Sequence, residues 1–362
     1  MLLVSAIFDL SQRTDFPKSA RKLHEYLQLF KYWSVFEQPM VLYLDATIQT
    51  TYATWIASLP ACIEVKFLTF EELPAYKLLL PDAPCIENAA ARDVFSYAVL
   101  TNSKFFLVEA ALEAHPSCTG AAWVDAGLCH VSYTPYNRLR KAFQKIEATA
   151  RPHAVMLNLL TKEHHDEELF KRNNYFIAGG FWFIPCAYAM KFAGACREAL
   201  TKLRELGRIA LEEQILSYVI SADYTEWNFS YSTFNSILAN LGRLNDPSTA
   251  LNLLEATYHQ SKTNYAGELI KQLLDYLARG GYLQPREMAR FLYYGFICSY
   301  HQDEQLRIFL ASLTRCLCTL WEPLTAAMDN YSNWKKNLAF ETREVKVPNE
   351  YLSCVSVVVA KQ

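Results

Sequence analysis

The sequence predicts an α/β fold in which a mostly parallel mixed sheet is flanked by helices and followed by an α-helical C-terminal extension. Over roughly the first 230 of 362 residues, short apolar runs alternate with segments whose apolar residues recur at helical spacing. Helical patterns alone follow, until a polar tail. The composition, 52% apolar and 20% charged, provides for a large core and argues against disorder.

Strands and helices alternate in the first part of the chain. The expected strands are Leu2–Phe8, Met40–Leu44, Ile63–Leu68 and Ala121–Val124. The expected helices are Ser19–Phe36, Thr51–Leu59 and Asn88–Leu112, the last one interrupted near Thr101–Ser103. Such alternation places helices on both faces of a largely parallel sheet. Ligands of these sheets collect outside the carboxyl ends of the strands.

The next segment continues the pattern less regularly. Tyr175–Ile184 is predicted as a strand that carries two adjacent glycines, and Tyr224–Tyr231 as a closing strand. Between them, Ala187–Leu206 and Ile209–Ser221 are predicted as helices. We therefore assign residues 1–240 to one α/β domain.

The character of the sequence changes near residue 240. Asp246 and Pro247 suit the N-cap and the first position of a helix. Four helical patterns follow, at 247–259, 263–279, 285–300 and 302–320. Because no repeat of fixed length is convincing, residues 241–335 are predicted as a helical extension rather than a repeat array. The tail, 336–362, is polar and then carries a predicted final strand, Tyr351–Ala360.

Several classes of function lose their usual signals. The net charge of −2 leaves no basic excess for a phosphate backbone, so nucleic acid is not an expected partner. No apolar stretch reaches the roughly 18 residues of a spanning helix, which leaves only peripheral membrane contact open. The ten cysteines include no C-x-x-C pair, which predicts reduced thiols in the cytoplasm rather than a zinc site. The sequence also lacks G-x-G-x-x-G, P-loop and G-x-S-x-G motifs.

Three aspartates, Asp9, Asp45 and Asp125, directly follow predicted strands. The carboxyl ends of parallel strands meet at one edge of a sheet, so these carboxylates would border a ligand site. The alternative is that each one begins a turn or caps a helix. Asp125 is followed by Ala126 and Gly127, which would leave room for a diphosphate and for a divalent ion held by the carboxylate.

Three further places carry candidate site residues. Gly179 and Gly180 interrupt an apolar strand, where a bare backbone suits either a packed sugar ring or a tight strand–helix contact. Glu213 and Gln214 lie in the first turn of a predicted helix. They either face a sugar or an acceptor hydroxyl, or the acid stabilises the helix through its dipole. Lys104 either assists substrate phosphates or is an ordinary helix-surface lysine.

In their order, these segments resemble the HtrL/YibB-like family of bacterial glycosyltransferases over residues 1–230. The matching segments are Val4–Asp9, Tyr26-Leu27, Met40–Asp45, Lys104, Trp123-Val-Asp-Ala-Gly127, Ile177–Gly180 and Glu213-Gln214. The resemblance implies a GT-A-like fold and a nucleoside-diphosphate sugar as donor. More distantly, the order is similar to retaining glycosyltransferases of the glycogenin type, which carry a D-x-D element, an Asn-x-Gly strand and an Asp-Gln helix start.

The resemblance also implies roles for individual residues. Asp125 would be the acid on the metal side, and Gly179 and Gly180 would line the sugar pocket. Glu213 and Gln214, the catalytic candidates, would lie beside the donor sugar or the acceptor. The remaining donor contacts are predicted at Asp9, Asp45, Lys104 and Gly127.

We therefore predict a glycosyltransferase that moves a sugar from a nucleoside diphosphate to a glycan, a lipid-linked sugar or a protein. Mn²⁺ or Mg²⁺, held by Asp125, is the expected cofactor. The second acid of a D-x-D element is missing, since Gly127 stands at its position. This favours one alternative, a GT-A-like module that binds a nucleotide sugar or glycan without turnover. The other alternative is an interaction scaffold that uses the helical region.

Overall fold

The computed structural model describes residues 1–18, 20–91, 93–260, 266–299, 303–331, 334–341, 343 and 345–347. The chain divides into two compact units, Met1–Gly242 and Arg243–Gln362. Across the described ranges, no helix is both long and apolar enough to cross a membrane. The predicted fold class, a mostly parallel mixed sheet flanked by helices with an α-helical C-terminal extension, is confirmed.

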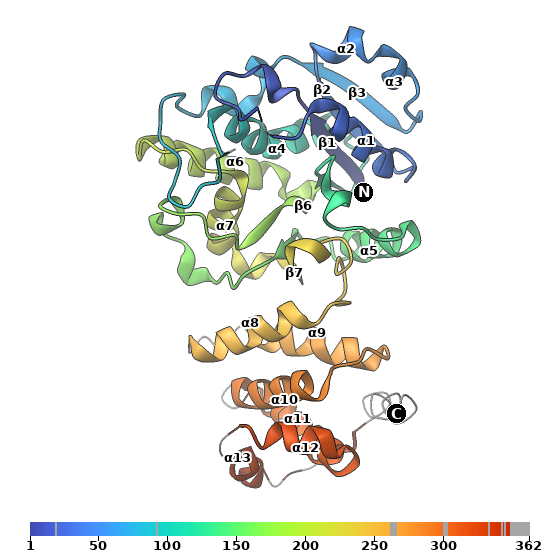
Figure 1. Cartoon of the computed structure of the whole chain (residues 1–362), viewed down its shortest axis with the longest axis vertical. Helices are drawn as coiled ribbons and strands as arrows, with labels where there is room; N and C mark the ends of the chain where they lie inside the picture. Colours follow the sequence, from blue (N-terminus) through green and yellow to red (C-terminus); the bar gives the residue numbers. More distant parts are fainter. Residues whose placement is uncertain are drawn as a thin grey trace. The chain divides into compact units, whose positions relative to one another are not determined.

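The first unit, coloured from blue to yellow in Figure 1, is built on a seven-stranded sheet with the order β3-β2-β1-β4-β6-β5-β7. The strands are β1 Leu2–Ile7, β2 Met40–Asp45, β3 Ile63–Leu68, β4 Gly120–Val124, β5 His153–Met156, β6 Ile177–Pro185 and β7 Asn228–Tyr231. All neighbours are parallel except β6, which is antiparallel to both β4 and β5. The start of β6 therefore lies beside the carboxyl end of β4.

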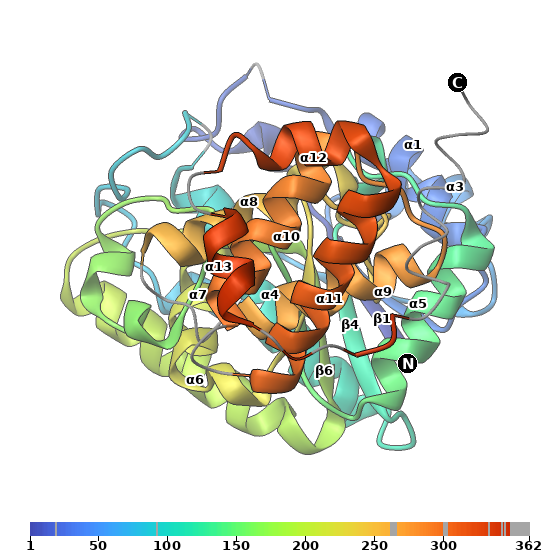
Figure 2. The same ribbon diagram turned by 90° about the horizontal axis from the view of Figure 1, so that it is seen from below.

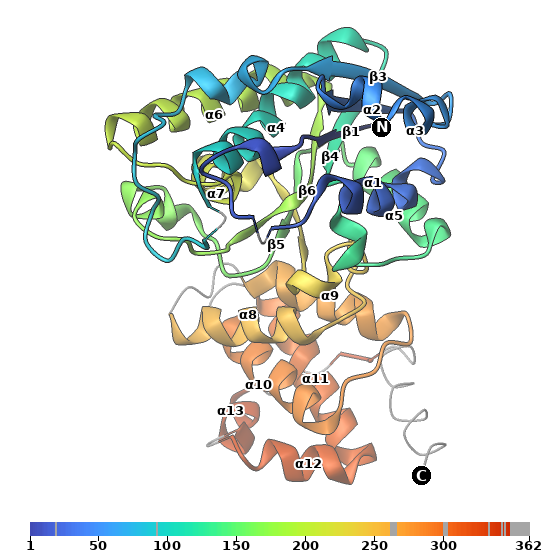
Figure 3. The same ribbon diagram turned by 45° about the horizontal axis from the view of Figure 1, so that its top comes forward.

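Helices cover both faces of this sheet (Figure 3). One face carries α1 Leu23–Ser34 and α5 Tyr136–Ala148, and the other carries α4 Phe95–Ala114, α6 Cys186–Glu205 and α7 Glu212–Ala222. The alternation of side chains along the strands divides the core accordingly. Phe181 and Phe183 of β6 pack with the α1 and α5 side chains. Trp182 between them packs against Phe105 of α4, with ring centroids 5.9 Å apart.

The regular elements that the structure describes in the second unit are helices (Figure 2). They are α8 Ser248–His259, α9 Ala266–Ala278, α10 Pro285–Ser299, α11 Glu304–Leu320, α12 Glu322–Met328 and α13 Trp334–Phe340. α10 packs against α8, α9, α11 and α12, which explains why Phe291 and Leu292 are fully buried. The four predicted helical patterns are confirmed as α8 to α11. The predicted final strand, Tyr351–Ala360, lies outside the described residues.

Two predictions about α4 are wrong. The helix begins at Phe95 rather than Asn88, because Asn88 has a positive φ of 59° and Ala90 and Asp93 close a turn, in which the Asp93 N–H donates to the Ala90 carbonyl at 2.8 Å and the Ala90 N–H donates to the Asp93 carboxylate at 2.7 Å. The helix is also continuous through residues 101–103. Asn102 is buried there, and its side-chain amide donates to the carbonyls of Ala98, at 2.9 Å, and Ala210, at 2.8 Å. The polar residues thus connect the helix to other segments without breaking it.

Smaller differences concern short elements. The predicted helix 51–59 is two short helices, α2 Ile48–Thr51 and α3 Ala53–Ala57. The closing strand is shorter than predicted, since a 3₁₀ turn at Tyr224–Glu226 precedes β7. β5 is not among the predicted strands. Its four residues are too few to show a period, and neighbouring strands rather than its own sequence pattern hold it in the sheet.

Candidate active site

Three charged side chains meet at the carboxyl end of β4. The Nζ atom of Lys104, on α4, lies 2.8 Å from Oδ1 of Asp125 and 2.5 Å from Oε1 of Glu212. The side chains of Lys104 and Glu212 are only 4% and 6% exposed, whereas that of Asp125 is 38% exposed. We call these three residues the charge network. It has a buried side toward α4 and α7 and an open side at Asp125.

Lys104 remains charged in this environment. Burial of its ammonium group by itself lowers the pKa, but the carboxylates of Asp125 and Glu212 outweigh that effect and raise the pKa above its usual value. The ammonium also donates to the carbonyl of Gly179 at 3.3 Å and lies 5.4 Å from the ring centre of Trp123. One positive charge is thus shared between two carboxylates, and the network carries a net charge of −1.

Asp125 is fixed from several sides. Its Oδ1 accepts hydrogen bonds from Lys104 and, at 2.7 Å, from the indole N–H of Trp123. Its backbone N–H donates to the carbonyl of Gly180 at 2.9 Å, and its own carbonyl accepts from the indole of Trp33 at 3.1 Å. The outer oxygen, Oδ2, is therefore the atom that the carboxylate can still offer to a ligand.

The two adjacent glycines of β6 border different groups on opposite faces of the strand. A Cβ atom on Gly179 would lie 2.2 Å from Oε1 of Glu212, so glycine is needed for this carboxylate to approach the backbone. A Cβ atom on Gly180 would lie 3.0 Å from Leu128 and 3.4 Å from Oδ2 of Asp125. The bare backbone at Gly179 thus accommodates a protein carboxylate, and the one at Gly180 borders the open side of the charge network.

The other two strand-end aspartates have local partners. Oδ1 of Asp45 accepts from the backbone N–H of Thr47 at 2.9 Å and from its hydroxyl at 2.7 Å, while Oδ2 accepts from the N–H of Asp9 at 3.2 Å. Oδ1 of Asp9 accepts from the N–H of Ser11 at 3.0 Å and from its hydroxyl at 2.6 Å. The structure thus brings Asp9 and Asp45 together, and both carboxylates hold the turns that follow their strands.

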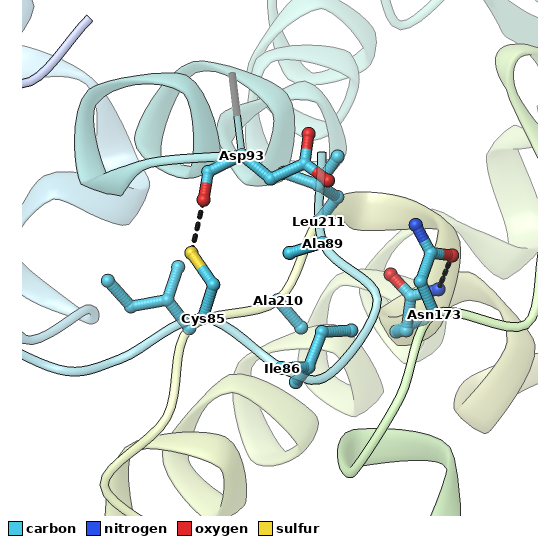
Figure 4. Close-up of a pocket in the computed structure, with 9 residues that line it drawn as sticks. Cys85, Ile86, Ala89, Asp93, Asn173, Ala210 and Leu211 are labelled. Carbon is cyan, nitrogen blue, oxygen red and sulfur yellow. Dashed lines mark hydrogen bonds between the residues drawn. The ribbon is translucent and has the colours of Figure 1, made fainter. Parts of the chain in front are cut away.

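The predicted catalytic pair begins α7. Glu213 is half-buried on the first turn. Gln214 is 2% exposed, and its amide donates to Oδ1 of Asn173 at 2.7 Å. Gln214 also lines a small cavity whose other walls are the 85–93 segment, Asn173 and residues 209–211 (Figure 4). The side chain of Gln214 therefore points into the protein, toward Asn173, rather than to the surface.

Glu212 is a site residue that sequence reasoning missed. The acid was visible in the sequence beside Glu213, but nothing in the helix pattern distinguishes the two. The available signal was Lys104, which directly precedes the apolar run Phe105–Val108 of a predicted helix and, once buried, requires carboxylate partners. A search for acids at helix starts that could face a buried lysine would have selected Glu212 together with Glu213.

A divalent ion would find few protein ligands here. Among the residues that the structure describes, no group of three or more His, Cys, Asp or Glu side chains could hold a metal ion. Mg²⁺, however, is commonly bound through one or two carboxylates together with substrate phosphates and water. Oδ2 of Asp125 fits that more limited role.

Comparisons with known proteins give low similarities. No family model matches the sequence, and no curated protein matches it. The apo form of mouse xyloside xylosyltransferase 1 is 10% identical with a TM-score of 0.33, and the match covers 67% of this chain and 94% of that chain. A manganese complex of a Mycobacterium tuberculosis protein is 10% identical with a TM-score of 0.29, covering 64% and 88%. A Thermus thermophilus mannose-1-phosphate geranyltransferase is 12% identical with a TM-score of 0.33, covering 64% and 73%.

Proposed function

We propose that this chain is a glycosyltransferase of GT-A-like fold that uses a nucleoside-diphosphate sugar as donor. The observation that carries the proposal is the charge network at the carboxyl end of β4. Ligands of open α/β sheets bind at the carboxyl ends of strands. Buried ionisable groups whose pKa values are shifted by charged neighbours are typical of functional sites. The family resemblance of the sequence points to the same residue, Asp125.

In this proposal the chain holds the donor at the open side of the network. The bare backbone of Gly180 would let the sugar or diphosphate approach Oδ2 of Asp125. Lys104, kept charged between the two carboxylates, would fix the orientation of Asp125 and offset part of the local negative charge. Asp9 and Asp45 would shape the neighbouring edge by holding the turns after β1 and β2.

A divalent ion, Mn²⁺ or Mg²⁺, belongs to this proposal. Asp125 would hold it through Oδ2, with the donor phosphates and water as the other ligands. When bound, the ion would neutralise charge that develops on the departing diphosphate.

The reaction requires an acceptor hydroxyl near the donor sugar. The bond between the anomeric carbon and the diphosphate oxygen breaks, the acceptor oxygen forms the new bond, and the hydroxyl proton is released. Glu213, at the start of α7 and next to Glu212, would orient the sugar or this hydroxyl. Gln214 would act from the inside, by fixing Asn173 against the start of α7. The acceptor is a glycan, a lipid-linked sugar or a protein.

The test is transfer or hydrolysis of nucleotide sugars by the purified protein with added Mn²⁺. A panel of UDP-, GDP-, ADP- and CDP-linked sugars should contain at least one donor that is turned over. The Asp125→Ala variant should lose at least 100-fold of that activity, on the order of the loss expected for an important transition-state contact. Asp275→Ala, which removes an exposed acid of α9, is the matched control. The absence of both turnover and thermal stabilisation with every donor of the panel would contradict the proposal.

A second candidate function is binding without turnover. The observation that favours it is the engagement of Oδ1 of Asp125 by Lys104 and Trp123, which leaves one carboxylate oxygen where a D-x-D element would offer more. Such a module would bind a nucleotide sugar and show no release of nucleoside diphosphate over hours. Stabilisation by a donor without turnover, in the same panel, would decide for this candidate.

A further inference from the structure

Arg21 lies against the turn that carries Asp125. This turn runs from Asp125 to Leu128, whose N–H donates to the Asp125 carbonyl at 3.0 Å. A Cβ atom on Gly127, within the turn, would lie 3.1 Å from Nη1 of Arg21. Arg21 immediately precedes the N-cap of α1, Lys22, and thus belongs to the long connection between β1 and α1. The guanidinium therefore stands at the same edge of the sheet as the charge network.

The guanidinium of Arg21 is held without the use of a carboxylate. Its Nη2 lies 2.7 Å from Nε2 of His130, and its carbon lies 5.2 Å from the ring centre of Tyr26. Nδ1 of His130 contacts the carbonyl of Gly127, so Nδ1 is the protonated nitrogen and Nε2 accepts from Arg21. In the described part of the chain, no Asp or Glu pairs with Arg21. Most of its five N–H donors are thus available to a ligand.

The charges around the site explain what such a ligand would be. The charge network carries −1, and Asp9 and Asp45 add two further carboxylates at the same edge of the sheet. The diphosphate of a donor brings about two more negative charges, so its binding needs cations. Arginine binds phosphate oxygens in a forked geometry that lysine does not offer. Arg21 is a half-buried cation beside the turn from Asp125 to Leu128, and it meets this need.

We infer that Arg21 binds the diphosphate of the donor, with His130 and Tyr26 holding the guanidinium against the bare backbone of Gly127. This inference rests on the proposed function and specifies a residue that it does not name. The glycine at 127 suits this arrangement, because a Cβ atom there would lie 3.1 Å from Nη1 of Arg21 and require the guanidinium to shift by a few tenths of an ångström.

The experiment measures binding of UDP, GDP, ADP, CDP and inorganic pyrophosphate to the full chain by calorimetry, with Mg²⁺ and with EDTA. For the nucleoside diphosphate that binds best, Arg21→Gln should raise Kd by about tenfold to a hundredfold, in line with the loss of charge-assisted hydrogen bonds. Arg21→Lys, which keeps the charge but not the fork, should lie between the wild type and Arg21→Gln. Binding of the corresponding nucleoside, which lacks phosphate, should not change.

Arg13→Gln is the matched control. Arg13 lies in the same connection, but its guanidinium is bound to Glu71 at 2.8 Å and lies 3.8 Å from the ring centre of Phe70. This variant should bind within twofold of the wild type, and the melting temperatures of all variants show whether they fold. Equal affinity of Arg21→Gln and wild type for the nucleoside diphosphate would overturn the inference and leave the proposed function standing. A wild type that binds no nucleoside diphosphate would overturn both.

Discussion

The carboxyl ends of β4 and β2 begin from the same sequence pattern and become different kinds of site. In each, an apolar strand leads directly into an aspartate. Asp45 of β2 is 5% exposed and accepts hydrogen bonds from the backbone N–H and the hydroxyl of Thr47 and from the N–H of Asp9. Asp125 after β4 is more exposed and bonds to a lysine from α4. Of these two strand-end aspartates, only Asp125 forms an ion pair with a described residue, because α4 places Lys104 beside it.

The difference teaches that burial and charge must be considered together. Asp45 can be buried because neutral donors, the N–H and hydroxyl of Thr47 and the N–H of Asp9, satisfy its carboxylate oxygens. Asp125 is instead part of a set in which removing one member leaves another charged group buried without compensation. The second arrangement is the more fragile one, and the following predictions test that contrast.

Removal of Lys104 should have the largest effect. Lys104→Met leaves the buried carboxylate of Glu212 without its cation, and losing one partner of a buried pair costs about 3–5 kcal/mol. The free energy of unfolding from urea titration measures this loss. Lys191→Met removes an exposed lysine that pairs with Asp223 at 2.6 Å, and it should cost less than about 1 kcal/mol. Similar losses for the two variants would refute the idea that the network is buried and coupled.

The two glycines of β6 should respond unequally to alanine. In Gly179→Ala the new Cβ would overlap Glu212, at 2.2 Å from Oε1, and must displace the whole carboxylate from Lys104. We expect a loss of about 2–3 kcal/mol, at the upper end of overpacking costs. Gly180→Ala meets its nearest neighbour, the end of the Leu128 side chain, at 3.0 Å and should cost about 1 kcal/mol or less. Urea titrations of both variants give the comparison, which fails if Gly180→Ala is the more damaging.

His153 of β5 is a buried basic group that has no carboxylate partner among the residues described. Burial, together with the charge of Lys145, lowers its pKa from 6.5 to about 3, so it is neutral in the folded chain. Because the unfolded chain takes up the proton first, this contribution to stability is complete above pH 6.5 and declines as the pH falls toward 3. The expected loss at pH 5 is about 2 kcal/mol.

Unfolding of His153→Gln between pH 7 and 5 measures this effect. The variant keeps a group able to bond with Ser230, which lies 2.8 Å from Nε2, and should lose less stability over this range than the wild type. His24→Gln, at an exposed position of α1, should retain the pH dependence of the wild type. Identical pH dependence in all three proteins would show that His153 can be protonated in the fold.

The strand-end turns should show the smallest effects. Asp45→Ala leaves the N–H groups of Thr47 and Asp9 without their acceptor, which should cost about 1–2 kcal/mol, as for a lost capping residue. Asp9→Ala removes only the bonds to Ser11 and should cost about 0.5–1 kcal/mol. Thermal unfolding resolves both. A loss on Asp45→Ala as large as that of Lys104→Met would erase the contrast between the two strand ends.

The elements predicted correctly are those whose apolar pattern is clear in the sequence. β1, β2, β4 and β6 are mostly apolar runs, β3 alternates apolar and charged residues at its start, and all five were predicted. The start of α4 was misplaced, because Asn88 adopts a positive φ and Ala90 and Asp93 close a turn where the apolar pattern alone indicated a helix. β5 has four residues and owes its place to its neighbours. In β5, tertiary contacts override local preference.

The site was predictable one residue at a time but not as a set. Asp125, Lys104 and the two glycines were selected from the sequence, and the structure places them together. Glu212 could not be separated from Glu213, because what distinguishes them is the side of α7 that faces α4. That choice depends on how two helices distant in sequence pack on the same sheet, which no local pattern contains.

The sequence distance within the charge network has a consequence for the order of events during synthesis. Asp125 follows Lys104 after 21 residues, whereas Glu212 is made only after a further 87. A nascent chain that ends shortly after β4 therefore contains Lys104 and Asp125 but lacks Glu212, and it also lacks β6, whose Gly179 carbonyl accepts a hydrogen bond from Lys104. Lys104 therefore acquires both of its carboxylate partners only after the start of α7 has left the ribosome. The charge network of the first unit thus depends on a helix that is made late in its synthesis.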